Sequence, residues 1–236
     1  MPAAYSRVIL KLSGEVLSGD SSDVFDHAHV DAIADAIIQT VNLSVQVGVV
    51  VGGGNIWRGR HGEGMNAVTA DHMGMLATCI NALCMQDALE RKGMPTRVQS
   101  AVEMRQMCEP YIRRRAIRHL EKGRVVIFAA GIGNPHFSTD TCAVLRAAEL
   151  DADAVLKGTN VDALYDKDPR QYPDAKPLHN ITYAQALGIG AKVMDLTAFT
   201  LCQERSIPEI RIFNLNDPTN IVRVAKGEEL GSRVHK

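Results

Sequence analysis

The sequence lacks any apolar run long enough to cross a membrane, and its cysteines lack the spacing of a metal site. No uncharged stretch approaches the roughly 20 apolar residues that a membrane helix needs. The five cysteines form no CxxC pair and are odd in number, so neither a zinc site nor a secreted disulfide framework is expected. No basic region followed by an apolar run opens the chain, so no signal peptide is predicted. These absences favour a cytoplasmic protein with reduced thiols.

An excess of charge of either sign is also missing. Lysine and arginine number 26 against 27 aspartate and glutamate residues, which gives a formal net charge of -1. A nearly neutral chain has no overall field that attracts nucleic acid or an anionic membrane, so neither is expected as a partner. Any site for an anionic ligand must therefore be built locally.

The common catalytic and nucleotide-binding motifs are absent too. There is no GxxxxGK[ST] phosphate loop, no GxSxG nucleophile elbow and no HExxH metalloprotease motif. Residues 62–67 match GxGxxA, but they lie in a polar stretch instead of directly after a strand. We therefore give that match little weight as a dinucleotide fingerprint.

Short apolar runs alternate with segments of helical periodicity along the 236 residues. Strands are predicted at Val8–Leu12, Val45–Val51, Val125–Ala130, Ala154–Lys157 and Ile210–Phe213. Helices are predicted at 30–41, 66–91, 139–150, 192–205 and 218–225, with Asp26 as the cap before the first. This alternation predicts an α/β fold, a three-layer αβα sandwich around a mainly parallel sheet. One domain, 1–236, is expected, with a division near Glu149 into halves 1–150 and 151–236.

Two segments have unusual composition. The helix at 66–91 is apolar nearly all round, which indicates burial on more than one side. A subunit interface and a central position inside the domain explain this equally well. Residues 158–177 are polar and are predicted to form a long loop, a feature that is often functional in compact domains.

Three predicted strands run into glycine turns. The first is followed by Ser13-Gly14-Glu15, the second by Gly52-Gly53-Gly54-Asn55, and the third by Gly131-Ile132-Gly133-Asn134-Pro135. Glycine lets backbone N–H groups approach an anion closely. Each turn alone is most simply a turn. Together, at equivalent ends of parallel strands, they predict a site of polyphosphate size.

Charged residues near these turns suit phosphoryl transfer, which needs positioning and positive charge more than covalent chemistry. Lys11 ends a buried strand, and Arg58, beyond the triple glycine, can bind two phosphate oxygens. Asp140 follows the third turn, at the start of a predicted helix, and is a candidate helix cap. It is also a candidate to orient Lys11 and to help place Mg²⁺ near the phosphates. Asp71 is a candidate to hold ribose hydroxyls. Lys192 and Asp195 add a cation and a carboxylate.

Six segments, in this order along nearly the whole chain, resemble the bacterial UMP kinases of the amino-acid kinase superfamily. They are Lys11 to Glu15, Gly52 to Asn55, Asp71 to Met75, Gly131 to Asp140, Lys157 to Asp162 and Lys192 to Asp195. The segments Asp71 to Met75 and Gly131 to Asp140 distinguish UMP kinases within the superfamily. The resemblance implies transfer of the γ-phosphoryl group of ATP to UMP in a homohexamer. The first half of the chain would carry most of the UMP site and the dimer contacts, and the second half most of the ATP site.

The resemblance also implies roles for individual residues. Those implied to act in catalysis are Lys11, Arg58, Asp140, Lys192 and Asp195. Those implied to bind ATP are Lys11, Leu12, Ser13, Gly14, Gly54, Arg58, Thr159, Asn160, Tyr165 and Asp168. Those implied to bind UMP are Gly53, Asp71, Gly131, Ile132, Gly133, Asn134, Pro135, His136, Phe137 and Ser138. Mg²⁺ would arrive with ATP, held mainly by phosphate oxygens and by no direct protein ligand.

Regulation is expected to follow the family only in part. Inhibition by UTP is implied by the resemblance. Many members carry a Gly-x-Gly-hydrophobic segment soon after the first motif that is linked to activation by GTP. Residues 18–25 here lack the second glycine and carry acids instead, which puts activation by GTP in doubt.

Two alternative functions are compatible with the sequence. One is a superfamily kinase of a carboxylate or carbamate, such as a carbamate, acetylglutamate or aspartate kinase. Asp71 and the turn at 131–138 count against it, because those substrates need no nucleoside pocket. The other is a non-catalytic binder on the same fold, such as a molybdenum storage protein. Retention of Lys11, Arg58, Asp140 and Asp195 together counts against a binder.

Overall fold

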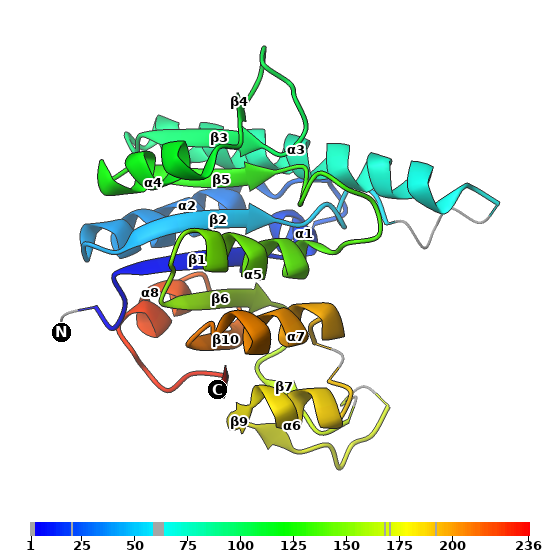
Figure 1. Ribbon diagram of the computed structural model, residues 1–236. Helices are drawn as coiled ribbons and strands as arrows, with labels where there is room; N and C mark the ends of the chain where they lie inside the picture. Colours follow the sequence, from blue (N-terminus) through cyan, green and yellow to red (C-terminus); the bar gives the residue numbers. More distant parts are fainter. Residues whose placement is uncertain (1–2, 20, 59–63, 168, 170, 192) are drawn as a thin grey trace.

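The computed structural model describes residues 3–19, 21–58, 64–167, 169, 171–191 and 193–236. Most strands of the described chain join one sheet in the order β4-β3-β5-β2-β1-β6-β10-β11-β9 (Figure 1). Their bounds are β1 Arg7–Leu12, β2 Gln46–Val51, β3 Thr96–Ser100, β4 Glu109–Pro110, β5 Val125–Ala129, β6 Ala154–Thr159, β9 Asn180–Thr182, β10 Glu209–Asn214 and β11 Ser232–His235. Neighbouring strands pair in parallel, except that β10 and β11 are antiparallel.

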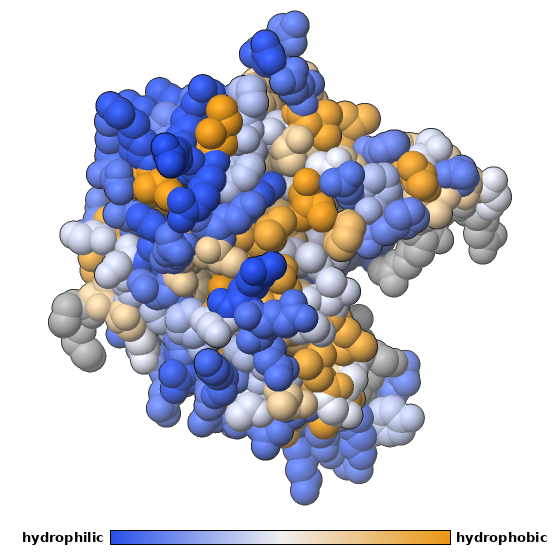
Figure 2. Space-filling view, in the orientation of Figure 1, coloured by the Kyte–Doolittle hydropathy of each residue, from blue (hydrophilic) through white to orange (hydrophobic). Residues whose placement is uncertain are grey.

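Helices cover both faces of this sheet (Figure 1). One face carries α2 (His27–Asn42), α3 (Ala67–Arg91) and α8 (Asn220–Ala225), and the other carries α4 (Arg113–Glu121), α5 (Thr139–Glu149) and α7 (Leu196–Arg205). Two short helices, α1 (Gly14–Ser18) and α6 (Tyr183–Gly188), complete the layers. The face with α4, α5 and α7 is largely hydrophilic outside (Figure 2). The predicted αβα sandwich with a mainly parallel sheet is therefore confirmed.

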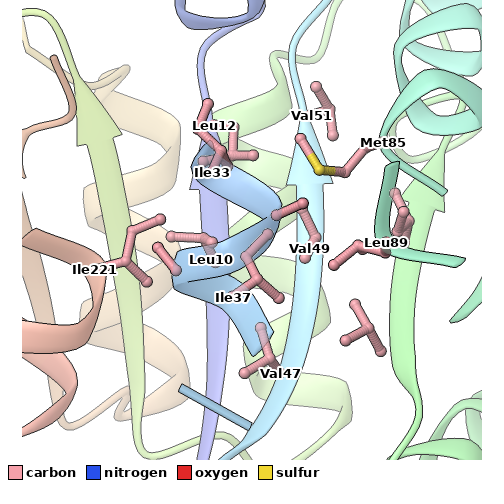
Figure 3. Close-up of a cluster of buried hydrophobic side chains, with 14 of the residues drawn as sticks. Leu10, Leu12, Ile33, Ile37, Val47, Val49, Val51, Met85, Leu89 and Ile221 are labelled. Carbon is pink, nitrogen blue, oxygen red and sulfur yellow. The ribbon is translucent and has the colours of Figure 1, made fainter. Parts of the chain in front are cut away.

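Side-chain alternation along the central strands divides the core into two layers. Leu10 and Leu12 of β1 pack with Ile33 and Ile37 of α2 (Figure 3). Ile9 of β1 belongs to the opposite layer with α5. Successive residues of a strand point to opposite faces, so every second residue after Ile9 joins that opposite layer. By this rule the side chain of Lys11 lies on the α5 face of the sheet.

Most predicted elements are present, with shifted ends. Asp26 caps α2 as predicted, because its carboxylate accepts a hydrogen bond of 3.1 Å from the His29 amide. The helix predicted from residue 192 begins only at Leu196, and the last helix begins at Asn220 instead of residue 218. The residues directly before the two helices, Asp195 and Thr219, are their N-caps, and helix ends are the part of an element that a sequence pattern defines least well.

The prediction of one long loop over 158–177 is wrong. Strand β6 continues through Thr159, and β7 (Leu164–Tyr165) pairs antiparallel with β8 (Pro177–Leu178). The strands β3, β4, β9 and β11 and the helices α1 and α6 were not predicted. They are short or carry few apolar residues, so their periodicity is weak.

Helix α3 runs past the carboxyl ends of the strands, and it is not central (Figure 1). One side packs on α2, β3 and β5, whereas Leu76 and Ile80 on another side are 56% and 49% exposed. Of the two explanations for its apolar composition, the central position is therefore wrong and the subunit interface stays a prediction. Among the described residues, no helix combines the length and the apolar character needed to cross a membrane.

Gly48 allows close packing in the middle of the sheet. A Cβ atom at this position would lie 2.8 Å from Ile9 Cδ1 and 2.9 Å from the Phe128 ring. We expect Gly48→Ala to lower the free energy of unfolding by about 1–3 kcal/mol, as overpacking does in well-packed cores. Urea unfolding measures the change. Gly188→Ala is the control, since no atom lies within 4 Å of its Cβ position. Equal midpoints for the two variants would contradict the expectation.

Candidate active site

The carboxyl ends of β5, β2, β1 and β6 lie side by side at one edge of the sheet, because these strands are neighbours and parallel. The three glycine turns and the start of the Thr159–Tyr165 segment follow these four strands. The structure thus brings together at one edge the turns that the sequence predicts to bind phosphate, as expected for ligand sites in α/β sheets.

Two lysines lie next to each other at this edge. Lys11 of β1 and Lys157 of β6 are direct partners in the parallel register. Both follow by two residues an apolar side chain of the α5 layer, Ile9 and Val155, so both ammonium groups point to the α5 face. Their side chains are only 8% and 5% exposed. Like charges in such positions repel each other, so this arrangement needs a compensating anion.

Asp140 in the first turn of α5 supplies that anion. Its Oδ1 lies 3.0 Å from Lys11 Nζ, and its Oδ2 accepts a hydrogen bond of 2.5 Å from Lys157 Nζ. Burial by itself raises the pKa of Asp140, but the charges of the two lysines lower it to about 2. The carboxylate is therefore charged at neutral pH, and its position fixes that of both lysines.

Lys157 loses its proton more readily than a lysine in water does. Burial and the adjacent charge of Lys11 lower its pKa to about 8, despite the attraction of Asp140. The ordinary value is 10.5, so the unfolded chain binds this proton more tightly than the folded protein. Keeping Lys157 charged in the folded protein therefore lowers the free energy of unfolding. This cost is fully present below about pH 8 and disappears as pH rises towards 10.5. Such perturbed groups in a cleft are typical of functional sites.

Asp195 and Ser138 join the starts of α5 and α7. Ser138 is the N-cap of α5, since its hydroxyl accepts hydrogen bonds from the amides of Asp140 and Thr141. The predicted capping role of Asp140 is therefore wrong, and its carboxylate is free to bind lysines. Asp195 caps α7 through the Ala198 amide and also accepts hydrogen bonds from the hydroxyls of Ser138 and Thr141.

The first two glycine turns touch each other. A Cβ atom on Gly14 would lie 2.6 Å from the Gly54 nitrogen, so only glycine allows this approach. Buried Asn81 of α3 donates hydrogen bonds to the Gly52 carbonyl (2.6 Å) and to the Asn55 side chain (2.7 Å). The two turns and α3 therefore form one rigid wall beside Lys11.

Arg58 lies on this wall, where its Nε donates to the Gly54 carbonyl at 3.1 Å and its guanidinium pairs with Glu15. The side chains of Arg58 and Glu15 are 33% and 42% exposed, so the pair is accessible to a ligand. Leu12 differs from the other predicted residues. Its side chain is fully buried in the core and its carbonyl accepts a hydrogen bond from the Gly52 amide. Its side chain is therefore not brought to the site.

A small pocket of about 140 Å³ lies on the α3 side of this edge. It is lined by Gly53, Trp57, Ala70, Asp71, Gly74, Met75, Thr78, Gly131, Asn134, Phe137 and Thr139. Asp71 joins its two walls, because its carboxylate accepts a hydrogen bond of 2.8 Å from the His136 amide. The structure thus combines Gly53, Asp71 and part of the third glycine turn, as the sequence predicts.

A larger pocket of about 500 Å³ lies beyond the end of β6. It is lined by Thr159, Asn160, Val161, Ala163, Leu164, Tyr165, Asp166, Lys167, Pro169, Gln171, Tyr172, Ile189, Gly190, Ala191 and Val193. Two tyrosine rings and several aliphatic side chains contribute apolar surface beside the polar groups of the lining, a combination that suits a nucleobase. Thr159, Asn160 and Tyr165 lie here as predicted, while Asp168 and Lys192 lie outside the described residues, as do Gly62 and Glu63 of the GxGxxA match.

Lys157 is the functional candidate that the sequence reasoning did not single out. Its signal was present, since it is a lysine at the end of a buried strand, as Lys11 is. Only the register of β1 with β6 shows that the two lysines meet at Asp140.

Among the described residues, no three His, Cys, Asp or Glu side chains are grouped as a metal site requires. Both oxygens of Asp140 already face lysines, and Asp195 already accepts several hydrogen bonds. This donor set fits a metal that is held chiefly by the phosphate oxygens of a nucleotide, as Mg²⁺ commonly is.

Residues 6–214 match the sequence model of the amino acid kinase family. The match spans most of the chain, and the protein therefore belongs to the amino acid kinase family.

Solved structures that are similar to this protein include UMP kinases and a uridylate kinase. The UMP kinase from Bacillus anthracis is 35% identical with a TM-score of 0.94, over 98% of this chain and 96% of that chain. The UMP kinase from Ureaplasma parvum is 38% identical with a TM-score of 0.91, over 98% of both chains. The uridylate kinase from Archaeoglobus fulgidus is 26% identical with a TM-score of 0.75, over 96% of this chain and 99% of that chain.

The lowered pKa of Lys157 predicts a pH dependence. We expect kcat/KM for the nucleotide donor to fall above about pH 8, because the free enzyme then loses the Lys157 proton. Lys157→Arg keeps its charge at any accessible pH and should remove this fall. Steady-state rates between pH 6 and about 10 test both statements, and NMR titration of labelled lysine side chains measures the pKa itself. An unchanged alkaline limb in Lys157→Arg would contradict the assignment.

Proposed function

We propose that this protein transfers the γ-phosphoryl group of ATP to UMP, which yields ADP and UDP. The observation that carries this proposal is the buried group Lys11, Asp140 and Lys157 between two pockets at one edge of the sheet. The similarity to UMP kinases over nearly the whole chain supports UMP as the acceptor. A carboxylate kinase or a storage protein is not favoured.

The chemistry follows from charge. A phosphate oxygen of UMP attacks the γ-phosphorus of ATP, and the bond from that phosphorus to the bridging oxygen of ADP breaks. Two anionic groups must approach each other, and negative charge develops on the leaving oxygen. Lys11 and Lys157 offer two positive charges that Asp140 holds in place before the reaction, which is how preorganised sites stabilise a transition state.

The larger pocket is proposed as the site of ATP. Tyr165 offers a ring for the adenine, with Thr159 and Asn160 beside it, and Asp168 is carried as a proposal from the resemblance alone. The phosphates would extend towards Ser13, Gly14 and Gly54, with Leu12 contributing only its backbone. Arg58 would exchange Glu15 for a phosphate. Mg²⁺ on these phosphates would supply further positive charge during transfer.

The smaller pocket is proposed as the site of UMP. Asp71 would hold the ribose hydroxyls. Gly53 and the turn from Gly131 to Ser138 would surround the uridine and its phosphate. Asp195 would hold the starts of α5 and α7 in register, with Lys192 nearby in sequence. On this proposal the first half of the chain, 1–150, carries most of the UMP site, and the second half, 151–236, most of the ATP site.

The remaining properties rest on the resemblance. A homohexamer, inhibition by UTP and a cytoplasmic location are proposed because the family resemblance implies them. The exposed apolar residues Leu76 and Ile80 of α3 support the proposal of contacts between subunits. Activation by GTP is not proposed.

The acceptor can be tested directly. Purified protein, ATP and Mg²⁺ are incubated with each nucleoside monophosphate in turn, and formation of ADP is followed. We expect turnover with UMP and much less with CMP, AMP or GMP. Equal turnover with CMP would contradict the specificity, and no turnover with any of them would favour a binding protein.

Removal of a catalytic charge has a distinct kinetic effect. We expect Lys11→Ala to lower kcat by about 10²–10³-fold, the loss typical for one group that stabilises transition-state charge. Affinity for UMP should change far less, because the charge acts mainly on the transferring group. Steady-state rates and calorimetric binding of UMP measure the two effects. A variant with unchanged kcat would show that Lys11 has another role.

A further inference from the structure

A second buried cation lies beneath the third glycine turn, apart from the lysines of the active site. Arg146 in the last turn of α5 is only 4% exposed. Its Nη2 donates a hydrogen bond of 3.4 Å to the Gly131 carbonyl, and its Nη1 donates one of 2.6 Å to Glu149 Oε2. One guanidinium group therefore joins the body of α5 to the turn that borders the small pocket.

Two aromatic rings hold this guanidinium in place. It lies 3.7 Å from the centre of the Tyr111 ring, and the Tyr111 hydroxyl donates a hydrogen bond of 2.6 Å to the same oxygen of Glu149. Tyr111 also meets Phe128 of β5 edge to face, with ring centres 5.6 Å apart. Stacking on Tyr111, one hydrogen bond to Glu149 and one to the Gly131 carbonyl leave the planar guanidinium little freedom.

The turn above Arg146 needs such support. Ala130 and Gly131 both have positive φ angles, 60° and 59°, and the left-handed conformation is unfavourable for alanine. Thr78 of α3 binds the turn from one side, because its hydroxyl oxygen accepts a hydrogen bond of 2.9 Å from the Ala130 amide. Arg146 binds it from the other side through the Gly131 carbonyl.

The Arg146 Nε is buried and has no hydrogen-bond partner among the residues that the structure describes. A buried donor without a partner is costly, but methionine at this position would leave the Glu149 carboxylate without its charged partner. An apolar side chain of this volume could bind neither the Gly131 carbonyl nor the Glu149 carboxylate.

We propose that Arg146, held by Tyr111 and Glu149, is a positioning residue for the acceptor nucleotide. A carbonyl oxygen that faces a phosphate repels it. By binding the Gly131 carbonyl, Arg146 keeps that oxygen turned into the protein and holds Gly131 and Asn134 along the pocket wall. This inference rests on the proposed assignment of the small pocket to UMP.

The test compares KM values for the two substrates in Arg146→Met and Tyr111→Phe. We expect Arg146→Met to raise KM for UMP about tenfold, the effect of losing one hydrogen bond to a charged group. KM for ATP should stay within about twofold, because the large pocket lies at the other end of the site. Tyr111→Phe keeps the ring but loses the bond to Glu149, so KM for UMP should rise by a smaller factor, about two- to threefold.

Arg113→Met is the matched control. Arg113 belongs to the neighbouring helix α4, donates to the Glu149 backbone carbonyl and pairs with Asp151 at 2.8 Å, but its side chain is 48% exposed. The Arg113→Met substitution removes one positive charge near the C-terminal end of α5, as Arg146→Met does, but Arg113 does not contact the turn at Gly131. KM for UMP should therefore not change. An equal rise in Arg113→Met, or equal rises for UMP and ATP in Arg146→Met, would overturn the inference.

Two further measurements keep the outcomes distinct. Urea unfolding checks that Arg146→Met is folded, and if it is not, an unchanged KM for UMP in Tyr111→Phe overturns the inference. Asp71→Asn reports on the pocket itself. If Asp71→Asn raises KM for UMP but the Arg146 and Tyr111 variants do not, the inference that Arg146 positions UMP is wrong. The assignment of the small pocket to UMP would then still be supported. If Asp71→Asn raises KM for ATP alone, the pocket assignment is wrong, and the inference with it.

Discussion

Two ammonium groups lie side by side in the interior of this protein because one carboxylate lies between them. The register of β1 with β6 places Lys11 beside Lys157, and the first turn of α5 places Asp140 against both. Each part requires the others, since two adjacent buried cations without an anion would be strongly unstable. The central sheet and the start of α5 are thereby fixed relative to each other, and two positive charges are ready where phosphates can meet.

The parallel sheet determines what surrounds this charge group. The carboxyl ends of four neighbouring strands open on one edge, so turns that are far apart in the chain become the walls of one site. Gly14 and Gly54 let two of these turns touch, and Asn81 fastens them to α3. A rigid frame of this kind suits phosphoryl transfer, in which most of the catalysis is positioning and electrostatics.

Local patterns were enough to predict the main strands, the long helices and the three glycine turns. The prediction failed where the structure depends on partners that lie far away in the sequence. The short strand β7 exists because β8 pairs with it, and no apolar run marks either one. Asp140 was a candidate cap in the sequence, yet its carboxylate lies between Lys11 and Lys157 of two different strands, while Ser138 caps the helix. Such roles depend on distance in space and not on spacing in the chain.

The sequence by itself determined the class of fold and the glycine turns, because apolar periodicity and glycine content act through local geometry. It also determined Lys11 as an unusual charge inside an apolar strand. Only the tertiary structure decided that Lys157 is its partner and that Arg146 lies beneath the third glycine turn. The physical reason is the same in both cases: strand register and helix placement bring distant charges within contact distance, and the energy of a charge depends on what it meets there.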